Sequence, residues 1–369
     1  GRLSPSSGIV TIAIGVSKNR ASCHPLKPGS LMPSGRPHEL QISVQSIAGG
    51  TFLPLVMMPP DRQGVAAKYR GRFAPSPTGP LHFGSLVAAV GSYLDARAHG
   101  GEWLVRIEDV DGPRTVPGAA DAILRTLDGF GFEWDGEVLV QSRRLDVYHA
   151  ALVRLQLDGH VYPCACSRSE IAAATNHLSV DGGLLYPGFC RAGLPEGRAA
   201  RAWRLRVPDR EFVFLDRVQG EHRQNLEREV GDFVLLRADG QYAYQLAVVV
   251  DDAAQGVNSV VRGVDLLDST ARQIWLQQCL GVPTPTYAHL PVVVNGSGEK
   301  LSKQTRAAAV DAAAGSTLLA QALGFLGHAV PDELRMAPVA EFWSWAIAAW
   351  SMARVPAVRA IFPGDEQGM

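Results

Sequence analysis

The sequence predicts an α/β fold in which a largely parallel sheet is covered by helices on both faces. From Lys68 onward, short apolar runs alternate with longer amphipathic segments, and this alternation is typical of strands that are joined through helices. Some of the apolar runs end in acidic residues, as in "EWLVRIEDVD" at residues 102–111. In an open parallel sheet, ligands bind beyond the carboxyl ends of the strands, so a binding site is expected there.

Strands are expected where apolar runs are short and bounded by polar residues, at 68–73, 102–111, 242–252 and 259–270. Helices are expected in the segment that ends near residue 97, at 119–130, at 144–159 and over most of the chain after residue 303. The pattern shows no internal repeat.

Composition and charge limit the classes of protein that remain. The chain of 369 residues exceeds one typical domain, so two or three structural units are expected. The longest apolar stretches, such as residues 340–352, fall short of a membrane span of roughly 20 residues or carry charge, so no membrane partner is expected. Five cysteines are an odd and sparse set that indicates a reducing compartment. A cytoplasmic location is therefore expected. A monomer is expected as well, although composition does not determine the oligomeric state.

Residues 1–66 differ in composition from the remainder. They contain eight prolines, six basic residues and two acids, without a sustained helical or strand period. Such a segment buries too little apolar surface to offset its chain entropy. A disordered tail, an organelle-targeting peptide and upstream sequence translated from a mis-assigned start are the three interpretations. The adjacent Met57 and Met58 favour the third.

A stiff loop, "APSPTGPLHFG" at residues 74–84, precedes the first expected helix. Pro75 and Pro77 restrict the backbone, and Gly79 and Gly84 permit close approach of a ligand. A helix start offers unpaired N–H groups that suit phosphate. The loop therefore predicts a nucleotide site, with a proline-stiffened connection as the alternative.

Two segments about 220 residues apart resemble the two signatures of the class I glutamyl-tRNA synthetase family. "RFAPSPTGPLHFGS" is similar to the first, and "KLSKQ" at residues 300–304 is similar to the second. The resemblance implies a class I aminoacyl-tRNA synthetase Rossmann-type catalytic domain over residues 67–303. It also implies an inserted zinc-containing subdomain at about 160–238 and a small C-terminal helical region at 304–369.

The reaction that the resemblance implies explains why two separated elements are needed. The glutamate carboxylate attacks the α-phosphate of ATP, and pyrophosphate leaves. His82 and Lys303 are the expected catalytic residues, because positioning and charge stabilisation dominate such transfers. Mg²⁺ is expected with the nucleotide. The implied ATP-binding residues are His82, Gly84, Ser85, Lys300, Ser302 and Lys303.

The resemblance also implies a site for L-glutamate. Arg72 and Arg262 would supply the cations that an anionic side chain requires, and Glu108 suits the substrate ammonium group. Tyr244 can donate a hydrogen bond. As the alternative, Arg262 is an ordinary ion-pair arginine with Asp265. The full implied set is Arg72, Phe73, Ala74, Pro75, Ser76, Glu108, Tyr244 and Arg262.

Three clustered cysteines predict one structural zinc ion per chain. Cys164, Cys166 and Cys190 offer three thiols for a tetrahedral site, and free buried cysteines are the alternative. His177 is the usual chemical choice for a fourth ligand. The segment resembles the zinc-binding insertion of the short paralogues of glutamyl-tRNA synthetase, in which a tyrosine completes the site, and this implies Tyr186.

The insertion continues into an arginine-rich stretch. Residues 191–210 contain six arginines and only two acids, Glu196 and Asp209. A solvated face is one interpretation, and phosphate contacts with RNA are the other.

Only 66 residues follow Lys303, too few for the helical domains with which a full synthetase reads the anticodon. The chain thus resembles the short paralogues, which glutamylate the queuosine base in the anticodon stem-loop of tRNA(Asp). A truncated synthetase that charges the 3′ end of tRNA(Glu) and a non-catalytic tRNA-binding protein are the alternatives.

Overall fold

The computed structural model describes residues 67–294 and 308–362, which belong to one unit of the chain. Its first parallel sheet has the strand order β1–β2–β3. A second sheet has the order β7–β6–β10–β9, in which β6, β10 and β9 are parallel and β7 is antiparallel to β6. The strands are β1 (Arg70–Phe73), β2 (Glu102–Ile107), β3 (Leu139–Val140), β6 (Glu211–Asp216), β7 (Gly220–Asn225), β9 (Ser259–Gly263) and β10 (Thr286–Leu290).

The edges of these two sheets meet at β1 and β9. The Arg70 N–H donates to Asn258 Oδ1 at 2.9 Å, and the Asn258 N–H donates to Arg70 O at 3.1 Å. From β1 the chain winds through α1 (Phe83–Ala98) to β2 on one side, whereas β9 leads through α7 (Thr270–Leu280) to β10 on the other. The winding direction therefore reverses between β1 and β9, where open α/β sheets form their ligand crevice.

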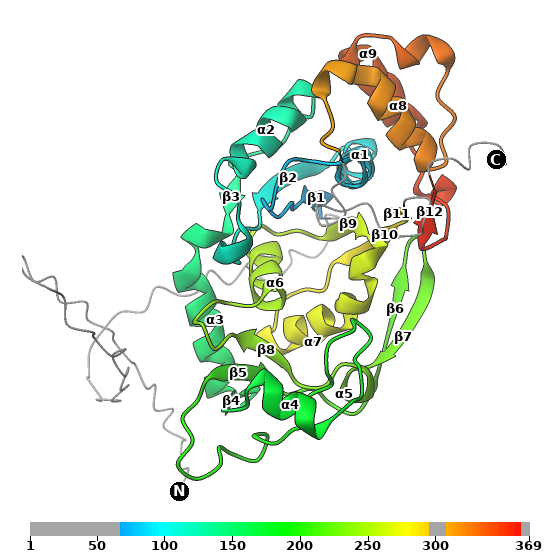
Figure 1. Cartoon of the computed structure of the whole chain (residues 1–369). Helices are drawn as coiled ribbons and strands as arrows, with labels where there is room; N and C mark the ends of the chain where they lie inside the picture. Colours follow the sequence, from blue (N-terminus) through cyan, green and yellow to red (C-terminus); the bar gives the residue numbers. More distant parts are fainter. Residues whose placement is uncertain (1–66, 295–307, 363–369) are drawn as a thin grey trace, which may run out of the picture. The chain divides into compact units, whose positions relative to one another are not determined.

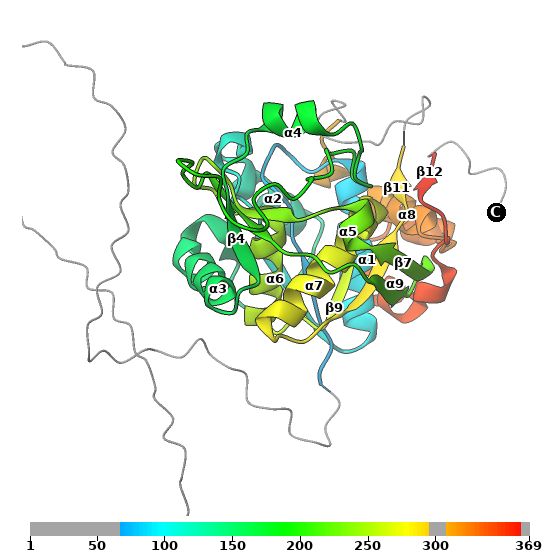
Figure 2. The same ribbon diagram turned by 90° about the horizontal axis from the view of Figure 1, so that it is seen from below.

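Helices cover both faces of these strands, as the sequence predicts (Figure 1). Strand alternation shows this directly: Val260 packs into one hydrophobic core and the next residue, Val261, into the other. One core includes α1, α2 (Ala119–Gly129), α8 (Gly315–Phe325) and α9 (Val339–Ala349). The other includes α3 (Leu145–Leu157), α6 (Tyr244–Ala254) and α7, which lie side by side in Figure 2.

The expected insertion contains a separate antiparallel sheet in the order β4–β5–β8. Its elements are β4 (Val161–Cys164), α4 (Arg168–Ala174), β5 (Ala202–Leu205), α5 (Leu226–Glu229) and β8 (Phe233–Leu236). Strands β6 and β7 also fall within residues 160–238, but β6 pairs with β10 through Asp216 and Tyr287. The middle of residues 160–238 is thus paired, through β6, with the second sheet.

The described residues 308–362 are largely helical. In addition to α8 and α9, this part contains η4 (Ala312–Ala314), η5 (Asp332–Arg335) and η6 (Met352–Arg354). Near its end, the short strand β12 (Ala360–Ile361) pairs in parallel with β11 (Val292–Val293), which precedes residue 295. Two further 3₁₀ turns, η1 (Gly112–Arg114) and η2 (Gln141–Arg143), follow β2 and β3, and η3 (Val264–Ser269) follows β9. Among the described helices, none has both the length and the apolar character to cross a membrane.

The prediction of a strand at residues 242–252 is wrong, because the segment forms helix α6. Residues 246–252 are all buried, so the run is apolar on every side of the helix and has no amphipathic period. The elements expected at 68–73, 102–111, 119–130 and 144–159 lie within a few residues of their predicted bounds. The strand at 259–270 ends earlier than predicted, at Gly263, where η3 begins.

Candidate active site

A cavity of about 940 Å³ opens at the carboxyl ends of β1 and β9. Its walls come from the loop after β1, the start of α1, the residues that follow β2, the start of α6 and the end of β9. The predicted glutamate-site residues Arg72, Phe73, Ala74, Pro75, Ser76, Glu108, Tyr244 and Arg262 all line it. His82, Gly84 and Ser85 line it as well, whereas Lys300, Ser302 and Lys303 lie outside the described residues.

The loop after β1 is held near its start by two backbone hydrogen bonds. Pro75 O accepts from the Glu108 N–H at 3.0 Å, and Pro77 O accepts from the Val116 N–H at 2.9 Å. Gly79 has a φ of 147°, a region that side-chain-bearing residues rarely adopt. The loop that the prolines predict to be stiff is therefore also anchored to the segment after β2.

His82 is the N-cap of α1, the helix that starts at the cavity wall. Its Nδ1 accepts from the Ser85 N–H at 3.3 Å, and its Nε2 lies 3.0 Å from Ser85 Oγ. The imidazole thus satisfies a helix-terminal donor and orients the serine hydroxyl beside the cavity. Gly84 and Ser85, both predicted to bind ATP, line the cavity at this helix start.

A network of buried charges forms the wall beneath Arg72. Arg72 Nε donates to Asp252 Oδ1 at 3.2 Å, and Arg106 Nη2 lies 2.7 Å from the same oxygen. Arg106 also donates from Nη2 to Glu108 Oε1 at 3.1 Å. Burial raises the pKa of the Glu108 carboxyl against the opposing attraction of Arg106 and Arg72. Burial also disfavours the charge of Asp252, but the two arginines outweigh this and lower its pKa.

Arg262 differs from Arg72 in its partners. Its side chain is buried and lines the cavity, yet no carboxylate of the described residues forms an ion pair with it. Its Nε donates to His289 Nε2 at 3.0 Å and its Nη1 to Gln273 Oε1 at 2.8 Å. The ion pair with Asp265, raised as an alternative, is not formed. Arg262 therefore brings a buried positive charge to the cavity that is neutralised less directly than that of Arg72.

Four residues of this region are not among the site residues that the sequence predicts. Arg106 and Asp252 pair within the network, and Asp216 and His289 stand behind Arg262. Arg106 lies at the end of β2, two residues before Glu108, and Asp252 ends the "VVVDD" run, so a charge within an apolar segment was the signal that could have found these two residues. Tyr244 begins α6, and burial raises the pKa of its phenol.

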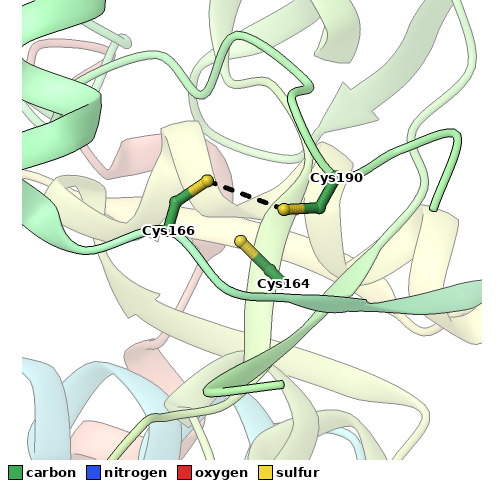
Figure 3. A group of neighbouring side chains, drawn as sticks. All are labelled: Cys164, Cys166 and Cys190. Atoms are coloured by element: carbon green, nitrogen blue, oxygen red, sulfur yellow. Dashed lines mark hydrogen bonds between the residues drawn. The ribbon is translucent and has the colours of Figure 1, made fainter. Parts of the chain in front are cut away.

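Away from the cavity, Cys164, Cys166 and Cys190 form a cluster in which the sulfur atoms all lie within 4.8 Å of one another (Figure 3). Cys166 Sγ is 3.6 Å from Cys190 Sγ, and all three are free thiols. The arrangement comes from β4, which ends at Cys164, and from the loop that returns to it. Such a cluster could hold a metal ion such as zinc.

Tyr186, the predicted fourth ligand, lies beside the cysteine cluster. Its hydroxyl lies 3.4 Å from Cys164 Sγ and 3.6 Å from Cys166 Sγ, and it accepts from the Cys190 N–H at 2.9 Å. The Arg204 guanidinium stacks on its ring at 3.8 Å, which places a cation beside the thiols. His177, the alternative fourth ligand, is exposed and outside the cluster.

The six arginines of residues 191–210 are mostly committed to contacts within the protein. Arg191 pairs with Glu227 and Arg198 with Glu170, and Arg210 donates to Gln278. Arg204 and Arg206 donate to the carbonyl oxygens of Asp232 and Arg191. The local charge excess therefore holds the insertion together, and this limits the phosphate-binding interpretation of the stretch.

The fold and the cavity define the catalytic domain of a class I tRNA synthetase. The family model "tRNA synthetases class I (E and Q), catalytic domain" matches residues 68–317. The crystal structure of a glutamate-tRNA synthetase from Elizabethkingia anophelis superposes with a TM-score of 0.65 at 26% identity. That superposition covers 79% of this chain and 68% of the other.

Curated relatives narrow the family further. A glutamyl-Q tRNA(Asp) synthetase of Dechloromonas aromatica is 66% identical over 288 residues, which cover 78% of this chain and 96% of the relative. One from Aromatoleum aromaticum is 62% identical, with 79% of this chain and 91% of the relative covered. The chain belongs to the glutamyl-Q tRNA(Asp) synthetases, a family of class I synthetase-like ligases.

Proposed function

We propose that this chain activates L-glutamate with ATP to form glutamyl-adenylate and transfers the glutamyl group to the queuosine base in the anticodon of tRNA(Asp). The observation that carries this proposal is the buried, cavity-facing charge of Arg262 beside a stiff loop and a helix start. Arg262 forms no ion pair with a carboxylate of the described residues, and a buried cation of this kind favours an anionic ligand, because a neutral one would leave it uncompensated.

Arg262 binds the side-chain carboxylate of glutamate in this proposal, and Arg72 adds a second positive charge. Glu108 binds the substrate ammonium group, since its contacts with Arg106 use only Oε1 and leave Oε2 for the ligand. Tyr244 donates a hydrogen bond from its hydroxyl. Glutamine would lose the charge pairing with Arg262, so glutamate is preferred.

ATP binds at the start of α1, where Ser85 and the backbone around Gly84 face the cavity. His82, Lys300, Ser302 and Lys303 contribute to the same site, with Mg²⁺ bound to the nucleotide. A glutamate carboxylate oxygen attacks the α-phosphorus and pyrophosphate leaves. A nucleophile of the queuosine base then attacks the activated carbonyl carbon, and AMP leaves.

Cys164, Cys166, Cys190 and Tyr186 hold one structural Zn²⁺ in this proposal. Three thiols and a phenol oxygen within contact distance of one another fit a closed four-ligand site. The small core around them contains few other apolar residues, so a metal would stabilise the insertion. The insertion at about 160–238 contacts tRNA, and the protein acts as a cytoplasmic monomer.

The test incubates the protein with ATP, radiolabelled glutamate and tRNA(Asp) that carries or lacks queuosine. Label is expected only on the queuosine-containing tRNA, and the product should resist treatment that removes the tRNA 3′ end. Label at the 3′ end of tRNA(Glu) would contradict the proposal and favour an ordinary charging synthetase. Labelled glutamine in place of glutamate is the matched control and should give no product.

A further inference from the structure

Behind Arg262 lies a buried chain of three polar residues that connects the cavity to the interior of the sheet. Asp216 Oδ2 is 2.6 Å from His289 Nδ1, and His289 Nε2 is 3.0 Å from Arg262 Nε. Asp216 and His289 are each at most 2% exposed and do not line the cavity. They come from the adjacent strands β6 and β10, and Arg262 comes from β9 next to β10.

The hydrogen-bonded series Asp216–His289–Arg262 has one consistent assignment of protons. An ionised Asp216 can only accept, so the His289 proton lies on Nδ1. His289 Nε2 is then an acceptor, and it receives the Nε–H of Arg262. Three backbone N–H groups, of His289, Val218 and Gln219, donate to Asp216 Oδ1 and fix the carboxylate in place.

Arg262 is held on its other edges by neutral acceptors. Its Nη1 donates to Gln273 Oε1, and its Nη2 donates to Thr270 Oγ1 at 3.0 Å and to Leu266 O at 3.3 Å. A guanidinium has five N–H groups, and four of them are occupied in this way when His289 is included. No described residue accepts from the remaining Nη1 N–H, which is left for a ligand in the cavity.

From this geometry we propose that Asp216 and His289 are positioning residues, which hold the Arg262 guanidinium in the orientation that binds the glutamate carboxylate. The proposal rests on the function proposed above for Arg262. Asp216 acts through His289, because its charge fixes the imidazole tautomer that Arg262 requires. Neither residue touches the substrate.

A neutral imidazole suits this position better than a second carboxylate would. A carboxylate next to Arg262 would neutralise it, as Asp252 does for Arg72, and would compete with the ligand. A protonated imidazole would oppose the guanidinium with a like charge and a donor facing a donor. Asp216 and His289 together, here called the relay, orient Arg262 while leaving its charge available to the ligand.

Asp216→Asn tests the relay because it changes one proton without changing the shape. The amide oxygen can still accept the three backbone N–H groups, so the amide NH₂ faces His289 Nδ1. The imidazole proton must then move to Nε2, opposite the Arg262 Nε–H. The KM for glutamate is expected to rise about 10- to 100-fold in pyrophosphate exchange, with the KM for ATP unchanged.

His289→Gln supplies the second arm, because the glutamine amide oxygen can replace Nε2 as an acceptor for Arg262. This variant should keep a glutamate KM within about threefold of wild type. In its background, Asp216→Asn should have little further effect, because no tautomer remains to be changed. Non-additivity of this kind separates a relay from general loss of packing.

Asp268→Asn is the matched control, since Asp268 contacts His222 at 3.8 Å and neither residue contacts Arg262. Arg262→Lys tests the proposed function itself and should raise the glutamate KM. An unchanged KM in Arg262→Lys would overturn the assigned role of Arg262. A raised KM there, with wild-type values in a folded Asp216→Asn variant, would overturn the relay alone. An equal rise in the glutamate KM when Asp216→Asn is introduced into the wild type and into the His289→Gln variant would also overturn the relay.

Discussion

Arg72 and Arg106 share one carboxylate oxygen of Asp252, at 3.2 Å and 2.7 Å. All three side chains are buried at the carboxyl end of the sheet. Glu108 adds a second negative charge through Arg106, so two cations face two anions before any ligand binds. The buried network beneath Arg72 is therefore close to electrically balanced, and the added positive charge at the cavity comes from Arg262.

Asp252→Asn is expected to lower the free energy of unfolding by about 3 kcal/mol, because it leaves a buried arginine without its counter-ion. Urea denaturation followed by circular dichroism measures this. Glu221→Gln removes one partner of an ion pair with Arg223 that is more than half exposed, and should change stability by less than about 1 kcal/mol. Equal effects in the two variants would show that the buried network is not a source of stability.

Tyr186→Phe is expected to weaken metal binding while keeping the ring on which Arg204 stacks. The purified protein should contain about one zinc per chain by elemental analysis, and Cys190→Ser should lose it. His177→Gln is the control and should retain full metal content, since His177 lies outside the cluster. A metal-free wild-type protein with normal stability would refute the zinc site.

The α/β class and the cavity position could be predicted from the sequence, because the loop prolines and the acidic end of β2 are local features. The helix at α6 could not, since a helix buried on all sides shows the same apolar run as a buried strand. The internal contacts of the arginine-rich stretch at residues 191–210 could not be predicted either, for a related reason. Charge composition shows that arginines are present, but only tertiary contacts show that Arg191 and Arg198 have internal partners.

The cavity-lining residues of the first motif could be named from the sequence, whereas the residues that support them could not. Asp216 and His289 lie more than 70 residues apart in the chain and meet only because β6 and β10 are neighbours. No local pattern marks such a pair. Asp252 is separated from Arg72 by 180 residues, and its pairing likewise depends on the sheet order.

Lys303→Ala is expected to reduce glutamate-dependent pyrophosphate exchange by at least about 100-fold, because a cation that stabilises charge in the transition state would be lost. The melting temperature should stay within a few degrees of wild type. Lys68→Ala is a suitable control, since Lys68 pairs with Glu102 at the surface. Wild-type exchange in the Lys303 variant would contradict the catalytic role that the second signature implies.

The buried histidine of the relay should make stability depend on pH in a defined window. Burial lowers the pKa of His289 to about 4, with Asp216, Arg262 and Asp265 as its charged neighbours. Between its unfolded pKa of 6.5 and about 4, the unfolded chain binds a proton that the folded protein does not, so stability falls as pH falls.

His328 is buried and has a lowered pKa as well, so it contributes in the same direction. We expect the free energy of unfolding to decrease from about pH 7 to about pH 5, by at most about 1.4 kcal/mol per pH unit for each of the two histidines. His289→Gln should reduce this slope and leave the contribution of His328. Urea denaturation at both pH values measures the slope, and an identical slope in wild type and variant would show that His289 is not held neutral in the folded protein.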